Sequence, residues 1–125
     1  MPVTSFADYA QGIAETLGAV LASGHAKHAN QEIEQRSMVR GLIGGVLLFV
    51  DDSELHFREY IDASLAEPRL MYVYHYQDAA KTLVFRYDNA RHRPPLTQAE
   101  HRHTPTTAEA SLAPTLEQVI DEILK

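Results

Sequence analysis

Three stretches of alternating residues decide the fold of this chain: ELHFREYID at 54–62, RLMYVYHYQ at 69–77 and KTLVFRYD at 81–88. Successive side chains of a β-strand point to opposite faces, so each stretch predicts a strand. The connections at 63–68 and 78–80 are too short for the crossover that parallel strands need. We therefore expect antiparallel neighbours in sequential order.

The segments before these stretches are less regular. Residues 38–50 are apolar and β-branched but contain Gly41, Gly44 and Gly45, which indicates a strand with a bulge or a close backbone approach. Residues 25–36 are polar around one isoleucine and predict only a connector or a marginal strand.

Both ends of the chain predict helices. Residues 5–24 and 114–124 repeat apolar side chains at three- and four-residue steps, and each segment begins near a capping serine or threonine. The C-terminal apolar stripe is expected to pack on the sheet. The predicted fold class is α+β, with an antiparallel meander sheet of four to five strands flanked by an N-terminal and a C-terminal helix.

Length and composition predict a single α+β domain over residues 1–125. The chain has 45% hydrophobic and 22% charged residues, which is enough apolar material for a core, and it has no cysteine for disulfides or thiolate chemistry. The longest apolar run, 46–50, is far shorter than the roughly 20 residues that cross a bilayer, and the N-terminus lacks the features of a signal peptide. We expect a cytoplasmic protein without a membrane partner.

The charge of the chain is unevenly distributed. The formal charge of −6 disfavours a general nucleic-acid-binding protein, because phosphate contacts need a positive surface. Residues 86–103 hold four arginines and two acidic residues, so they carry +2 before histidines are counted and the rest of the chain carries −8. This segment predicts either a site for an anionic ligand or a solvated polar loop. Residues 89–107 show no periodicity, and a loop of that length in a compact domain favours function.

The arginines and histidines of this segment fit metal-free cleavage of a phosphodiester. One imidazole would take the proton of a ribose 2′-hydroxyl, another would protonate the leaving oxygen, and Arg86 or Arg102 would stabilise the phosphate charge. If 101–103 is extended, its two histidines lie on one side. The candidate catalytic residues are Arg86, Asp88, His92, His101 and His103, and the candidate substrate-binding residues are Glu59, Asn89, Arg91 and Arg102.

Other interpretations of these residues stay open. Glu59 is a carboxylate on the apolar face of 54–62, so it either pairs with an arginine of the cluster or lies at the exposed rim of the sheet. His101 and His103 could instead ligate a metal ion, with Asp88, His92 or His75 as the nearest further ligands. The phosphodiester mechanism itself needs no metal and no cofactor. The cluster could also be a surface network that only keeps the chain soluble.

Five strings of the sequence resemble the TumE family of toxins from toxin–antitoxin systems: GGVLLFVDDSEL at 44–55, REYI at 58–61, YHYQD at 74–78, FRYDNA at 85–90 and HRH at 101–103. The likeness covers roughly residues 38–124, which would be the toxin-like core. The shared polar positions are Glu59, Arg86, Asp88, Asn89, His92, His101 and His103. The chain departs from the family pattern at Asp52, where the family has glycine, and at Ala99-Glu100, where it has Pro-His.

The resemblance implies the toxin of a type II toxin–antitoxin system, which inhibits growth when free and is neutralised by a cognate antitoxin, often of helix-turn-helix type. Together with the Arg/His cluster it predicts an endoribonuclease that acts on RNA. The alternative is a non-catalytic interaction protein that binds a cellular target or the antitoxin through the same patch. Exposed tyrosines on the strand at 69–77 and the acidic exterior would suit a homodimer or a basic antitoxin.

Overall fold

The computed structural model describes residues 5–89, 101–104, 108–110 and 113–125. Within these ranges the chain forms two helices and eight strands, which confirms the predicted α+β class. The elements are α1 (Phe6–Ala22), β1 (Ala26–Ala29), β2 (Glu32–Gln35), β3 (Arg40–Phe49), β4 (Glu54–Asp62), β5 (Arg69–Gln77), β6 (Leu83–Asp88), β7 (His101–His103), β8 (Ala108–Ala110) and α2 (Leu116–Leu124). None of the described helices is long and apolar enough to cross a membrane.

All strands belong to one antiparallel sheet in the order β1-β3-β4-β5-β6-β7-β8, and β2 also pairs with β3. The meander predicted for residues 38–88 is therefore confirmed. The sheet is wider than four to five strands for two reasons. Residues 25–36 supply β1 and β2. The chain after β6 supplies β7, inside the segment that was expected to be a loop, and β8, which pairs with β7.

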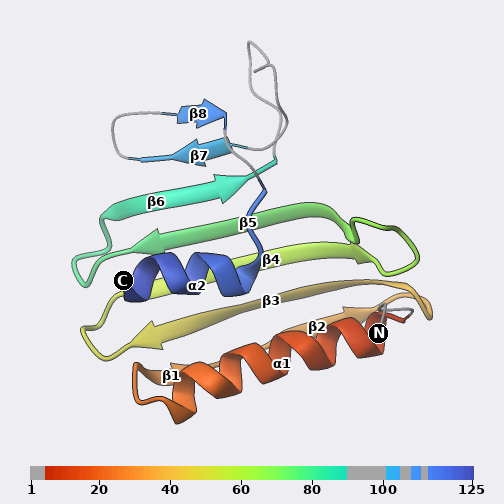
Figure 1. Ribbon diagram of the computed structural model, residues 1–125, viewed down its shortest axis with the longest axis horizontal. Coiled ribbons are helices and arrows are strands. Elements are labelled where there is room, and N and C mark those ends of the chain that lie inside the picture. The colour runs from red at the N-terminus through yellow and green to blue at the C-terminus, as the bar shows by residue number, and fades with distance from the viewer. Residues whose placement is uncertain (1–4, 90–100, 105–107, 111–112) are drawn as a thin grey trace.

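Both helices cover the same face of the sheet (Figure 1). The amphipathic pattern of α1 buries its apolar side against β1 and β3, and α2 packs beside it with an apolar stripe of its own. Each helix starts where predicted: Ser5 Oγ accepts a hydrogen bond from the Asp8 backbone, and Thr115 forms a capping box with Gln118. The opposite face carries no helix of the described residues, and we call it the open face.

Glycines in β3 allow a close approach of other parts of the chain, as the sequence predicted. A Cβ atom at Gly41 would lie 2.5 Å from the ring of Phe6, and one at Gly45 would lie 2.2 Å from the carbonyl oxygen of Asn30. The sequence also allowed a bulge in this strand. The pairing of β3 with β4 contains none, because its register is continuous.

The β3–β4 turn contains Asp52, one of the positions at which the chain departs from the pattern that the resemblance implies. Asp52 has a φ of 71°, in the left-handed region that glycine adopts without steric cost. The resemblance leads us to expect glycine here, and this chain has an aspartate in that turn. Aspartate is one of the few side chains that tolerate this conformation.

The tyrosines of β5 are not exposed, contrary to expectation. Tyr72 and Tyr74 are 2% and 0% exposed, and Tyr76 is partly buried against the core. Their rings lie on the face that the helices cover, where Tyr72 and Tyr74 stack with centroids 5.5 Å apart. They are core residues, so they give no support for a homodimer interface.

Candidate functional site

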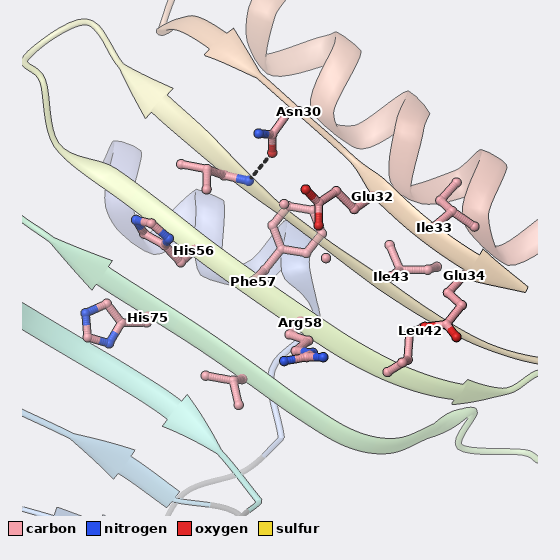
Figure 2. Close-up of a pocket in the computed structure, with 14 residues that line it drawn as sticks. Asn30, Glu32, Ile33, Glu34, Leu42, Ile43, His56, Phe57, Arg58 and His75 are labelled. Atoms are coloured by element: carbon pink, nitrogen blue, oxygen red, sulfur yellow. Dashed lines mark hydrogen bonds between the residues drawn. The ribbon is translucent and has the colours of Figure 1, made fainter.

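The open face gathers the polar side chains of the central strands. Strand alternation places Leu55, Phe57 and Tyr74 in the core, and the residues between them point to the other side. His56 and Arg58 of β4 and His75 of β5 project from this face in Figure 2. The register then aligns polar residues of four neighbouring strands.

The central row of this site follows directly from the pairing. His56 of β4 is paired with His75 of β5, and His75 is paired with Arg86 of β6. Arg86 is paired in turn with His103 of β7. Directly paired residues on adjacent strands have backbones only about 5 Å apart. Arg86 therefore has a histidine position on each side of it.

The two histidines with described side chains contact each other. The rings of His56 and His75 meet edge to face with centroids 6.2 Å apart. His56 Nε2 donates a hydrogen bond of 3.0 Å to the carboxylate of Glu54, which also binds Lys81. Burial, and then the charge of Arg86, lowers the pKa of His75 below its ordinary value. A neutral His75 imidazole near neutral pH is suited to accept a proton.

Asp88 orients Arg86. The Nε–H of Arg86 donates a hydrogen bond of 2.9 Å to Asp88 Oδ2, and the Asp88 side chain is only 4% exposed. A charge-assisted hydrogen bond to a buried carboxylate restricts the long arginine side chain. The remaining guanidinium nitrogens stay on the open face, since the Arg86 side chain is 40% exposed.

The other candidates from the segment after β6 have different placements. Asn89 binds the backbone of strand β5: its side chain accepts a hydrogen bond from Tyr72 N and donates one to Leu70 O. His101 and His103 lie in β7, which confirms that their segment is extended. His92 and Arg91 lie outside the described residues.

Glu59 lies on the helix-covered face and is completely buried. It accepts hydrogen bonds from the hydroxyls of Tyr9 on α1 and Tyr74 on β5, the latter at 2.5 Å. Burial raises the pKa of Glu59. Arg69 donates a hydrogen bond of 3.1 Å to the same Tyr74 hydroxyl. Glu59 thus neither pairs directly with an arginine of the cluster nor lies at the rim, and it joins α1 to the sheet.

Arg102 also points to the helix-covered side. It is paired with Tyr87, donates a hydrogen bond of 3.1 Å to the Tyr87 hydroxyl, and forms an ion pair of 3.1 Å with Glu122 of α2. Its guanidinium carbon lies 5.2 Å from the centre of the Phe85 ring. These contacts attach α2 to β6 and β7.

Sequence reasoning missed two residues of the site. The pattern of 54–62 put His56 and Arg58 on the polar face, and the predicted meander placed this strand beside 69–77. It did not give the register that aligns His56 with His75. Arg58 forms no ion pair with another described side chain. Among the described residues, no group of three His, Asp or Glu side chains is placed to bind a metal ion.

The fold and the site define an α+β protein with a two-helix layer on one face of an antiparallel sheet and a His/Arg cluster on the other. The family model described as Toxin TumE matches residues 16–125, so the chain belongs to the TumE toxin family. The match begins within α1 and extends through α2. It implies that a cognate antitoxin is the partner of this protein. No curated protein and no solved structure matches the chain.

Proposed function

We propose that this TumE-family toxin is a metal-independent endoribonuclease whose reaction takes place on the open face around Arg86. The observation that carries the proposal is the pairing of Arg86 with His75 on one side and His103 on the other. Displacement at phosphorus needs the attacking and leaving oxygens on opposite sides of the phosphate. A cation between two histidine positions suits that geometry.

In the proposed reaction the Arg86 guanidinium binds the scissile phosphate and stabilises the charge that builds on it. His75 takes the proton of the ribose 2′-hydroxyl as the 2′-oxygen bonds to phosphorus. The bond from phosphorus to the 5′-oxygen breaks, and His103 gives that oxygen a proton. The products are a 2′,3′-cyclic phosphate and a 5′-hydroxyl, so atoms and charges balance without a further reactant.

The surrounding residues have supporting roles in this proposal. Asp88 is a positioning residue that holds Arg86, as its 2.9 Å hydrogen bond indicates. His56 positions His75 through their ring contact. Arg58 is exposed on the same face and binds a neighbouring phosphate. Arg91 is proposed to bind RNA, as the sequence predicts, and His92 and His101 remain candidate catalytic residues.

The test is growth of a bacterial culture after induction of the wild-type chain, an Arg86→Gln variant and a His75→Ala variant, with total RNA from each. We expect arrest and fragmented RNA with the wild type only. The matched control, Lys27→Ala, removes an exposed cation of the edge strand β1 and should still arrest growth. Arrest without RNA fragments, or arrest by all variants, would contradict the proposal.

The alternative is a non-catalytic toxin that blocks a cellular target through the same patch. A cleavage assay with the purified protein distinguishes the two functions. A metal-independent enzyme cleaves an excess of RNA over many turnovers in the presence of a chelator. A binding module would retain RNA or a protein without releasing cyclic phosphate ends.

We further propose that the antitoxin is of helix-turn-helix type and covers the open face, which would exclude RNA from Arg86. Chemical-shift changes of the His56 and His75 ring protons on antitoxin binding would support this arrangement. Homodimer formation is a separate hypothesis. The molecular mass of the free toxin in solution tests it.

A further inference from the structure

A hollow of about 690 Å³ lies on the open face beside the histidine row, over β2 to β5. Its lining includes Gly44. Figure 2 labels four further lining residues: Glu32, Arg58, His56 and His75. Glu32 is paired with Gly44, and Gly44 is paired with Arg58, so the three residues form one line across β2, β3 and β4. Glu32 and Arg58 therefore lie on the same face of the sheet, on either side of a residue without a side chain.

Both charged groups are available for a ligand. Glu32 and Arg58 are exposed, and neither has a hydrogen bond or an ion pair to another described side chain. Neighbouring Glu34, in contrast, pairs with Arg36 at 3.4 Å. Strands lie about 4.8 Å apart, so the backbones of Glu32 and Arg58 are separated by roughly 10 Å. The absence of a side chain at Gly44 leaves this space open above the sheet.

We infer that this hollow is a subsite for a guanine nucleotide of the RNA, with the base over Gly44, its amino edge on Glu32 and its phosphate on Arg58. The inference rests on the proposed function and adds a base preference to it. Guanine presents two adjacent donors, N1–H and N2–H, which bind the two oxygens of one carboxylate. Uracil presents one N–H between two carbonyl oxygens, which a carboxylate repels.

The position of the subsite relative to Arg86 is consistent with one RNA strand. Gly44 and Arg86 are separated by three strand spacings and two residues along the strand, which is about 16 Å. The guanine is therefore not the nucleotide at the cleaved bond. It anchors the strand next to that bond, and the phosphate on Arg58 is distinct from the scissile one.

The test is a titration of the purified toxin with 5′-GMP and with 5′-UMP, followed by NMR. We expect GMP to bind at least about tenfold more tightly than UMP, and Glu32→Gln to weaken GMP binding by about tenfold, as for a hydrogen bond to a charged group. Gly44→Val should weaken both nucleotides because it fills the hollow. Glu117→Gln, which removes an exposed carboxylate from α2, should change neither.

Equal affinity for the two nucleotides, or an unchanged Glu32→Gln variant, would overturn the subsite. These results do not depend on catalysis. A toxin that cleaves RNA without any preference for GMP would keep the ribonuclease function and lose the subsite. A toxin that binds GMP through Glu32 but cleaves no RNA would keep the subsite and lose the ribonuclease function.

Discussion

The imidazole ring of His75 lies edge to face against that of His56, with the ring planes at 87°. This contact joins β4 and β5 on the open face, next to Arg86. Both side chains are only partly buried, so their loss should cost little stability.

The first prediction concerns catalysis by these histidines. His75→Ala should lower the rate of RNA cleavage by about 10²- to 10⁴-fold, the usual contribution of general acid–base catalysis. His56→Ala should lower it less, because His56 acts through His75. The control His25→Ala, in the connection between α1 and β1, should leave the rate unchanged. Rates equal to wild type in both open-face variants, at equal melting temperature, would remove these histidines from the mechanism.

The second prediction is the titration of His75. Burial and the charge of Arg86 favour the neutral imidazole, so the pKa of His75 should lie below 6.5. The acid limb of the cleavage rate should then also lie below pH 6.5. Arg86→Gln should raise the pKa of His75, because it removes a positive charge. NMR titration of the ring protons measures both values, and a His75 pKa at or above 6.5 would be inconsistent with the proposed base.

The third prediction concerns stability and pH at Glu59. Burial raises its pKa above the ordinary value of 4.5, so the folded state binds this proton more tightly than the unfolded state. The resulting stabilisation is complete below about pH 4.5 and is lost as pH rises through the folded-state pKa. Glu59→Gln cannot titrate, so its free energy of unfolding relative to wild type should increase over that range.

Denaturant unfolding at several pH values measures this difference for Glu59→Gln, with each unit of pKa shift corresponding to about 1.4 kcal/mol. The control is Thr16→Ala on α1, which removes no titratable group and should keep a constant difference from the wild type at every pH. A constant difference between Glu59→Gln and wild type across the pH range would mean that Glu59 does not titrate differently on folding.

The strands that could be predicted from the sequence are those with one buried face. The alternation of 54–62, 69–77 and 81–88 reports a buried side and an exposed side, and the structure has β4, β5 and β6 there. Strand β2 is exposed along its whole length and gives no such signal. Strand β7 has three residues, too few for a period to be recognised. Backbone hydrogen bonds to neighbouring strands stabilise both strands, and such bonds produce no pattern of apolar residues in the sequence.

The site could be predicted only in part for a related reason. Residues that are close in sequence, such as Arg86 and Asp88, share a face through simple alternation. The contact of His56 with His75 depends on the register between β4 and β5, which the sequence does not specify. The partners of Glu59 come from positions 50 and 15 residues away, so nothing near it in the sequence identifies them.

The last prediction separates two arginines that the sequence alone treats alike. Arg102 contacts Tyr87 and Glu122 on the helix-covered face, so Arg102→Gln should lower the free energy of unfolding by about 1–2 kcal/mol and leave RNA cleavage by the folded protein close to wild type. Arg86→Gln retains a donor for Asp88 and should change stability less, while cleavage falls by at least about 100-fold, because the charge that stabilises the phosphate is lost. Thermal unfolding and cleavage assays on both variants measure the two effects. If Arg102→Gln abolishes cleavage at full stability, the reaction takes place on the helix-covered face, and the open face loses its role as the centre of the site.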